Sequence, residues 1–242
     1  MGRRAAASAR FAPGRRSQET AADLTGNVER MFAPERLAAL AERVRPTAAS
    51  STRLLPVFPA IAALLPEAGL RRGTVLRCTG PAALSLALAI SAGPSAAGSW
   101  CGAVGLDDVG VLAAAGYGVD LERLVVVRGA PGQWAVAAGM LLDGLDLVLV
   151  APPVRPRPAA VRTLAARARD RGGVVLVVES PAGSPADLEL AVTESRWHGL
   201  AEGAGRLQAR RVTVVARGRG SAARPVSQEL WLPTATGKVA AA

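Results

Sequence analysis

The sequence predicts an α/β fold in which helices flank a mostly parallel central sheet, followed by an antiparallel C-terminal extension. Short, wholly apolar runs alternate with helical patterns along the middle of the chain, as buried parallel strands and their crossover helices do. Half of the residues are hydrophobic but only 3% are aromatic, so alanine, valine and leucine must build the core. The 242 residues suffice for one substantial domain with short appended segments.

The N-terminal part is predicted to lie outside this core. Residues 1–22 are basic and lack a hydrophobic period, which predicts a disordered tail. Residues 23–66 predict a helical segment, because apolar residues recur at helical spacing after Pro34 until Pro46 ends the pattern. A second, shorter helical pattern covers Ile61 to Leu65.

Residues 67–185 predict the α/β core, because apolar strands and helices alternate there with glycine-containing turns between them. The predicted strands are Thr74–Cys78, Ser99–Val104, Leu124–Arg128, Asp146–Val150 and Val174–Val178. The predicted helices are Ala82–Ala92, Val109–Ala115, Gln133–Leu142 and Ala159–Arg171. This alternation favours a parallel sheet with helices packed against it.

Residues 186–234 predict a C-terminal β extension. Strand-forming residues alternate or cluster over Glu189–Arg196, Arg210–Arg217 and Gln228–Leu232. Because no long helix separates these runs, they predict antiparallel strands added to the main sheet, with a small additional sheet as the alternative. Residues 235–242 predict a disordered tail.

The formal charge of +10 comes almost entirely from arginine, because Lys238 is the only lysine. A P-loop needs a lysine in the turn after its first strand, and Lys238 lies far from any such turn. The single histidine, His198, and the two cysteines, Cys78 and Cys101, are too few for a histidine-based metal site or a zinc cluster. We therefore expect no cofactor, no metal, and two buried thiols in a reducing compartment.

No stretch of the sequence predicts a membrane segment. The longest apolar run, Ala82–Ala92, is about half of what a membrane-crossing helix needs. The apolar stretch near the N-terminus, Ala5 to Ala7, is too short for the core of a signal peptide. We expect a soluble, cytoplasmic protein without membrane contact.

The middle of the chain resembles the core of the RecA recombinase family. GLRRGTV at Gly69–Val75, running on to Gly80-Pro81, is similar to the strand that precedes the P-loop of that family. GVD at Gly118–Asp120 is similar to the close of a later helix, and Asp146–Val150 is similar to the Walker B strand. The resemblance implies a RecA-like core within the predicted α/β fold.

The catalytic positions of that family are empty in this sequence. The degenerate P-loop consists of Gly80, Pro81, Ala82, Ala83, Leu84 and Ser85. Ala151 stands where the Walker B aspartate should follow its strand. Near the position of the catalytic glutamate the closest carboxylates are Asp107 and Asp108, which are offset from it. Phosphoryl transfer depends on the positioning and the charges of such groups. Because the chain resembles the family but lacks these groups, we expect that the protein is not an enzyme.

Within the RecA-like superfamily, the chain resembles the ImuA-type (ImuA′) accessory proteins of bacterial mutasomes. The motifs that carry this likeness are GVDLERLVVV at Gly118–Val127, SRWHGL at Ser195–Leu200 and ELWLP at Glu229–Pro233. The resemblance implies a non-catalytic scaffold for translesion synthesis after DNA damage, recruited to the nucleoid. It implies an ImuB-like inactive Y-family polymerase relative as partner, with an error-prone replicative-type polymerase or RecA as further partners.

Tryptophan and arginine residues of the C-terminal part are the candidate contact residues. The candidates for a protein partner are Trp197, Arg210, Arg211 and Trp231. Tryptophan and arginine are enriched at interface hot spots, but the tryptophans fit equally well as a cover for one sheet face. The candidates for weak nucleic-acid contact are Arg206, Arg217 and Arg219. A solvated face is the equal alternative for these arginines.

Two other functions remain open at this stage. The first is a RecA-like cell-division inhibitor of the SOS response, another group without ATPase activity. The second is a DNA-binding module without a protein partner, which predicts DNA affinity with a steep salt dependence.

Overall fold

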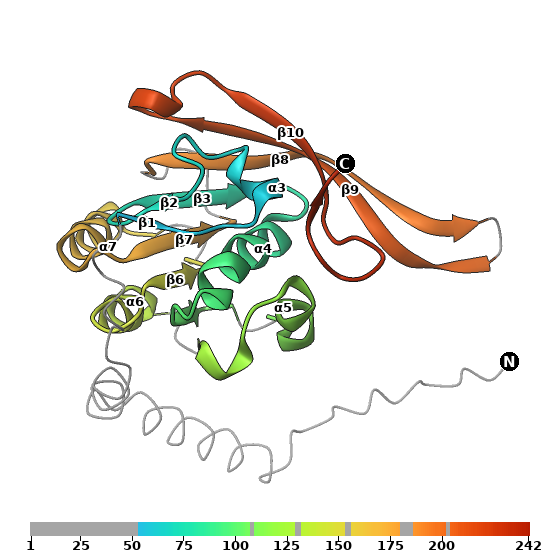
Figure 1. The fold of residues 1–242 in the computed structure, drawn as a ribbon. Coiled ribbons are helices and arrows are strands. Elements are labelled where there is room, and N and C mark those ends of the chain that lie inside the picture. The colour runs from blue at the N-terminus through green and yellow to red at the C-terminus, as the bar shows by residue number, and fades with distance from the viewer. Residues whose placement is uncertain (1–52, 107–108, 129–131, 153–155, 180–185, 202–203) are drawn as a thin grey trace, which may run out of the picture. The chain divides into compact units, whose positions relative to one another are not determined.

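The computed structural model describes residues 53–106, 109–128, 132–152, 156–179, 186–201 and 204–242 (Figure 1). The tail predicted at 1–22 and the helix predicted after Pro34 lie outside the described residues. Asp107 and Asp108 lie outside them as well.

A nine-stranded mixed sheet forms the centre of the described fold. Its strands are β3 (Val75–Thr79), β4 (Cys101–Val104), β5 (Leu124–Val127), β6 (Leu147–Val150), β7 (Val174–Val178), β8 (Leu188–Ala201), β9 (Ala204–Gly218), β10 (Val226–Trp231) and β11 (Ala240–Ala241). They lie in the order β11-β10-β9-β8-β3-β7-β6-β4-β5. The strands from β8 to β5 in this order run parallel, and β9, β10 and β11 are antiparallel additions. The predicted α/β fold with a mostly parallel sheet and an antiparallel C-terminal extension is confirmed.

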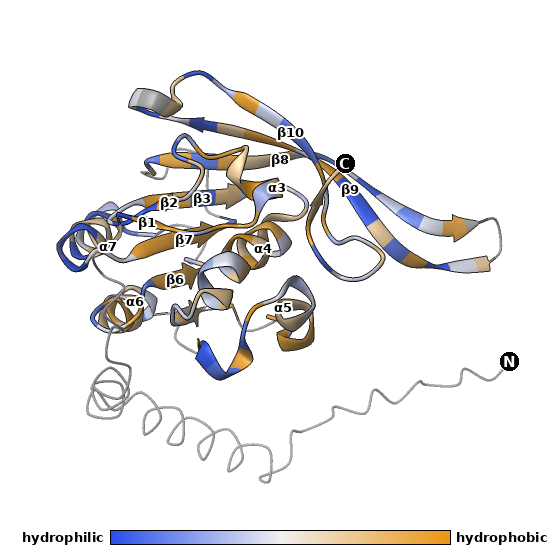
Figure 2. Cartoon of the chain, viewed as in Figure 1, coloured by the Kyte–Doolittle hydropathy of each residue, from blue (hydrophilic) through white to orange (hydrophobic). Residues whose placement is uncertain are grey.

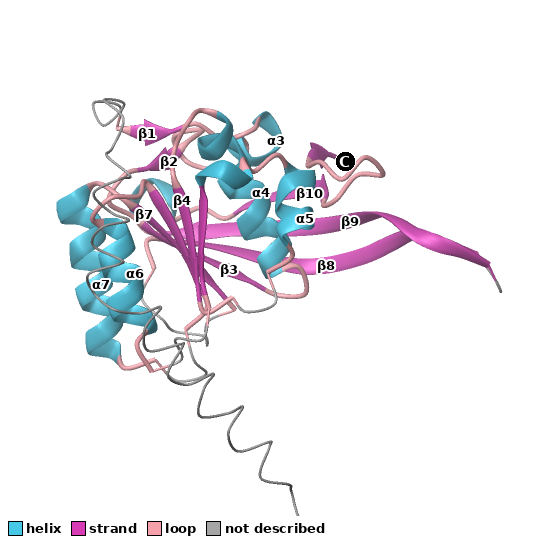
Figure 3. Cartoon of the chain, turned by 90° about the horizontal axis from the view of Figure 1, so that it is seen from below, coloured by secondary structure: helices cyan, strands magenta, loops and turns pink. Residues whose placement is uncertain are grey.

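Helices cover both faces of the parallel part of the sheet (Figure 3). One face carries α3 (Pro59–Ala62), α4 (Ala83–Ala96) and α5 (Val111–Tyr117), and the other carries α6 (Trp134–Leu142) and α7 (Pro158–Arg171). The strands are apolar on both sides for this reason. In β6, Leu147 and Leu149 belong to the core cluster on the α4 side, while Val148 and Val150 are equally buried on the opposite side.

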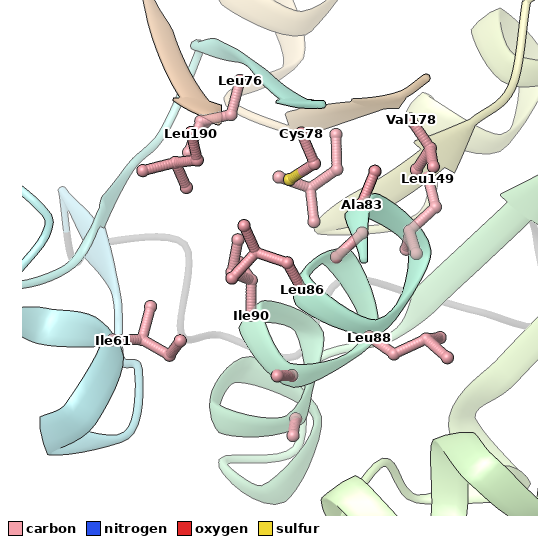
Figure 4. Close-up of a cluster of buried hydrophobic side chains, with 14 of the residues drawn as sticks. Ile61, Leu76, Cys78, Ala83, Leu86, Leu88, Ile90, Leu149, Val178 and Leu190 are labelled. Carbon is pink, nitrogen blue, oxygen red and sulfur yellow. The ribbon is translucent and has the colours of Figure 1, made fainter. Parts of the chain in front are cut away.

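The main core cluster lies between α4 and the sheet. Figure 4 shows Ala83, Leu86 and Ile90 of α4 facing Leu76 and Cys78 of β3. Most of α4 is buried all around, because the sheet covers one side and α3 and α5 cover others. A helix enclosed in this way needs no polar face, which explains the uninterrupted apolar run in the sequence.

The elements of the predicted core are present with ends shifted by a few residues. Five strands, β3 to β7, and the four helices α4 to α7 occupy the predicted places. None of the helices in the described part of the chain is long and apolar enough to span a membrane.

The segment just before the core differs from the prediction of a helical segment at 23–66. Within its described part, β1 (Leu54–Leu55) pairs antiparallel with β2 (Leu70–Arg71). The helix predicted at Ile61–Leu65 is instead α3, which begins at Pro59 and ends at Ala62. Closely spaced prolines permit only a short helix, because proline favours a first turn but blocks continuation.

The C-terminal strands belong to the main sheet, so the alternative of a separate small sheet is wrong. Two of them, β8 and β9, are much longer than predicted and extend beyond the helical layers (Figures 1 and 2). The tail predicted as disordered at 235–242 is also different, since Ala240 and Ala241 pair with Trp231 and Leu230 of β10. A turn makes this return possible, in which the amide of Lys238 donates to Thr234 Oγ1 at 3.1 Å.

Candidate functional site

The carboxyl edge of the parallel strands is where an α/β sheet of this kind binds ligands. After β3 the chain continues to α4 on one face of the sheet, and after β6 it continues to α7 on the other face. Only Gly80, Pro81 and Ala82 connect β3 with α4. This connection holds the first three residues of the predicted degenerate P-loop, at the edge where a sheet of this kind binds ligands.

The turn after β3 folds back on itself. The amides of Ala82 and Ala83 both donate to the carbonyl of Gly80, at 2.8 and 3.0 Å. Gly80 has φ +90, and a Cβ built there would lie 2.1 Å from the carbonyl oxygen of Val192 in β8. A phosphate cradle requires several backbone amides that point at the ligand, and two of these amides are already used within the turn.

Arg210 of β9 closes this turn from the other side. Its Nη2 donates to Ser85 Oγ at 2.6 Å and its Nη1 to the Pro81 carbonyl at 3.4 Å. Its Nε donates to the carbonyl of Leu232 at 2.8 Å. The residue is 8% exposed, and its guanidinium carbon lies 4.8 Å from the ring centroid of Trp197. The cation next to the turn after β3 is therefore an internal arginine with protein acceptors.

Tyr117 completes the polar cluster at the start of α4. It is buried, and burial raises the pKa of its phenol. Hydrogen bonds with Ser85 and Arg210 and the charge of Arg210 oppose this rise in pKa. Sequence patterns did not single out Tyr117, because its contacts come from elements far apart in the chain. Helix α5, the start of α4 and β9 meet at this cluster.

The Walker B position holds no ligand group. Ala151 follows β6, its amide donates to the Val104 carbonyl at 3.1 Å, and its methyl group packs on the core cluster. Glu179, which sequence patterns also missed, follows β7 and has a left-handed φ of 51. Its amide donates to the Cys78 carbonyl at 3.0 Å, and its side chain is exposed. In the described residues, no three acidic, histidine or cysteine side chains gather as metal ligands would.

A second group of predicted residues lies on the face of β8, β9 and β10 that no helix of the described residues covers. Arg211 and Trp231 are register partners on it, and the ring centroids of Trp231 and His198 lie 5.1 Å apart in an edge-on contact. Arg211 forms an ion pair with Glu229, and both side chains are about half exposed. We call the group Glu194, Arg196, His198, Arg211, Thr213, Glu229 and Trp231 the outer patch. The members of this patch other than Trp231, together with Ser195 and Val212, line a hollow of 480 Å³.

The structure separates the candidate contact residues into different places. Trp197 and Arg210 meet on the inner face of the sheet, whereas Arg211 and Trp231 lie on the outer patch. Arg206 lies near the tip of β9 and Arg217 near its other end, about 36 Å apart at roughly 3.3 Å per residue. Arg219 lies just beyond that far end. The three arginines predicted to contact nucleic acid therefore do not form one patch.

The two cysteines are free and buried. Burial raises the pKa of Cys78 from 9.0 to about 12. Burial, with a smaller effect from the charge of Asp146, raises the pKa of Cys101 to about 12 as well. Both thiols are therefore core groups, with no role in the chemistry of the carboxyl edge.

These features define a class of α/β protein. An internal arginine closes the carboxyl-edge turn of its mixed sheet, and none of the described helices covers the outer face of its C-terminal strands. The chain belongs to the family of the MT3502 N-terminal domain, whose family model matches residues 63–183, half of the chain. The chain is also similar to the uncharacterized protein Rv3395c of Mycobacterium tuberculosis (strain ATCC 25618 / H37Rv), with 35% identity over 144 residues. This similarity covers 59% of the chain and 66% of that protein. The family match ends before β8, so Arg210 and the outer patch lie outside it.

Proposed function

We propose that this protein is a non-catalytic scaffold of a DNA-damage-induced translesion synthesis complex, of the ImuA type within the RecA-like superfamily. The observation that carries the proposal is the closed turn at Gly80. The sheet keeps the strand, turn and helix of a nucleotide-binding core, but Arg210 occupies the turn. Such a sheet is suited to binding proteins rather than nucleotides. The absence of the lysine and of the Walker B aspartate from the sequence supports the same conclusion.

The proposed partner is an ImuB-like inactive relative of Y-family polymerases, and the outer patch is its proposed docking surface. The patch combines Trp231, a histidine, and charges of both signs, with arginine and glutamate side chains about half exposed. Interfaces with proteins favour tryptophan and arginine at their centres. An error-prone replicative-type polymerase or RecA is a further partner in the complex.

The test is co-purification of the full chain with the ImuB-like protein. A double variant, Arg211→Ala with Trp231→Ala, removes the centre of the outer patch. We expect at least a tenfold loss of affinity, because removing two hot-spot residues costs about 2 kcal/mol or more. The matched control is Arg217→Ala with Ser227→Ala, which removes exposed side chains from the far ends of β9 and β10.

The control variant should bind the partner like the unmodified chain. Unchanged binding by the patch variant would refute the docking surface. Absence of any complex between the unmodified proteins would refute the scaffold function itself.

A further inference from the structure

The two edges of the nine-stranded sheet differ in how they are protected. At one edge β11 has only two residues and lies close to the exposed Lys238. At the other edge β5 has four residues, as many as β4 and β6, and among the described strands it pairs with β4 alone. Short strands, charges and prolines protect sheet edges against other chains. The sequence of β5, LVVV, contains neither a charge nor a proline, so this edge can accept another strand.

Apolar side chains at this edge are only partly covered. Every residue of β4 and β6 is buried, but Leu124–Val126 of β5 are half buried. Leu121 begins η2 (Leu121–Arg123), the 3-10 turn before β5, and is 42% exposed. Leu112 lies in α5, which packs against η2, and is 83% exposed. Apolar groups that gather on a surface in this way indicate contact with another protein.

The backbone groups of β5 that point away from the sheet can be identified. The Val127 carbonyl accepts from the Gly105 amide at 3.3 Å, so Val125 and Val127 direct their backbone groups toward β4. Leu124 and Val126 direct theirs to the open side, because successive residues of a strand alternate. The Leu124 amide is already used within η2. Within the described part of the chain, the Leu124 carbonyl and the amide and carbonyl of Val126 therefore have no backbone partner on this side.

A charge of each sign flanks the strand. Glu122 precedes β5 and Arg128 follows it, and both side chains are exposed. In the described residues neither side chain forms an ion pair or a hydrogen bond, whereas Arg123 is held by Asp120 and by the Gly98 carbonyl. Glu122 and Arg128 lie roughly 15–20 Å apart along the chain, too far to pair with each other. Each is available to an opposite charge on another molecule.

We propose that two copies of this chain pair through β5, antiparallel about a two-fold axis that passes by Val125 and is perpendicular to the sheet. In this register Leu124 of each copy lies opposite Val126 of the other. The Val126 amide of one copy then donates to the Leu124 carbonyl of the other, so the groups on the open side are matched. Glu122 of each copy lies opposite Arg128 of the other, and the two ends of the contact carry the same ion pair.

Other registers of the same pairing fit less well. A shift by one residue sets a residue that faces β4 opposite one that faces outward, so the hydrogen bonds are lost. The same shift places Arg123 opposite Arg128 of the other copy, which is repulsive. A shift by two residues keeps the hydrogen-bonding side but moves Glu122 away from Arg128. Backbone direction and charge therefore favour the same arrangement.

The contact closes with two copies, because both copies use the same strand. The sheet then continues from one copy into the other. β5 and the strands of the outer patch lie at opposite ends of the strand order, so each copy keeps its patch accessible. The dimer does not depend on the proposed function, but it would give a scaffold two identical docking surfaces.

The first test measures the mass of the full chain by sedimentation velocity over a series from about 5 to about 500 µM. We expect a monomer–dimer equilibrium with Kd on the order of 10 µM, because a contact made by one short strand is small. No species larger than a dimer should appear at the highest concentration.

Charge reversal tests the register. Glu122→Arg and Arg128→Glu each turn two ion pairs of the dimer into two repulsive pairs, and each should weaken the dimer about tenfold. An equal mixture of the two variants should regain the affinity, because every contact between unlike copies then joins opposite charges. The matched control is Arg162→Glu, which reverses an exposed arginine on α7 and should leave Kd unchanged.

A third variant, Val126→Pro, removes the amide that crosses the contact. Proline is tolerated at an edge position whose amide faces outward, so the ladder with β4 should persist. Circular dichroism checks the fold, and the variant should be monomeric over the same series. If the proline disrupts the sheet, the charge reversals decide the question alone.

Several results would overturn the proposal. A chain that stays monomeric over the whole series has no such contact. Assemblies that grow beyond two copies would show an open, head-to-tail contact instead. A dimer that survives both reversals or a folded Val126→Pro variant, or a mixture that regains nothing, would place the contact elsewhere. None of these results bears on the ImuB-like partner, whose binding is tested at the outer patch.

Discussion

At the scale of single residues, Arg210 decides what the carboxyl edge can bind. A guanidinium that is 8% exposed must be matched by acceptors, and Arg210 has three of them, on Pro81, Ser85 and Leu232. In a nucleotide site, a positive charge at this place would bind the ligand. In this protein the charge of Arg210 joins β9 to α4. The residue that sequence reasoning assigned to a partner surface is therefore placed in the interior.

Arg210→Met should lower the free energy of unfolding by about 2–4 kcal/mol, because the variant leaves buried acceptors without a donor. The adjacent Arg211→Met is the matched control. Its ion pair with Glu229 is about half exposed and contributes less than about 1 kcal/mol. Denaturant unfolding of both variants gives the comparison. Equal losses would show that Arg210 does not connect the two elements.

The buried thiols provide a pH-dependent prediction. Burial raises the pKa of Cys78 and of Cys101 from 9.0 to about 12, so the folded state favours the neutral thiol. The resulting stability is fully present below pH 9 and is lost as the pH rises toward 12. Native protein should not react with a thiol-specific disulfide reagent at pH 8, whereas both thiols should react in guanidinium chloride. Rapid reaction of either thiol in the native state at pH 8 would contradict the burial.

At the scale of elements, the outer end of the β8–β9 hairpin and the sheet have separate stabilities. No described side chain from Gly199 to Gln208 is buried, so shortening the hairpin there removes no core contact. An Asn-Gly turn in place of residues 199–208 joins His198 to Ala209, which are register partners. This variant should keep its thermal midpoint within about 3 °C of the unmodified chain, which corresponds to about 1 kcal/mol. Circular dichroism during heating measures this, and a decrease of 10 °C or more would show that the hairpin end supports the sheet.

The elements differ in how well the sequence predicts them. Strands such as DLVLV and VVLVV are predictable, because residues buried on both faces must all be apolar. The outer end of the β8–β9 hairpin is not predictable in this way, since the side chains of SRWHGL are exposed and show no hydrophobic alternation. The final return of the chain at Ala240–Ala241 depends on a turn and on the open edge of β10, and neither gives a hydrophobic period.

From the sequence, the candidate site could be predicted only through the catalytic residues that it lacks. The absent lysine and aspartate can be read directly from the residues after β3 and β6. The closure by Arg210 and Tyr117 cannot, because these side chains come from β9 and α5 and meet only in the folded chain. Long-range contacts of single polar side chains produce no periodic pattern in a sequence.

At the scale of the whole molecule, the closed turn predicts that nucleotides have no effect on stability. A ligand at one hundred times its Kd stabilises a protein by about 2.7 kcal/mol, which raises the thermal midpoint by several degrees. Millimolar ATP with magnesium should leave the midpoint of this protein unchanged, with a P-loop ATPase measured in parallel as the positive control. A reproducible increase that depends on magnesium would contradict the closure of the turn.

The turn after β10 carries the only lysine of the chain, Lys238, whose side chain is exposed. It lies beside an apolar hollow of 690 Å³ that Phe58, Tyr117 and Val239 help to line. Because Lys238 is the only side-chain amine, an amine-reactive fluorophore or crosslinker attaches to the folded part of the chain at one defined position once the α-amino group has been blocked. A crosslink from it would identify which part of a bound protein lies next to β10.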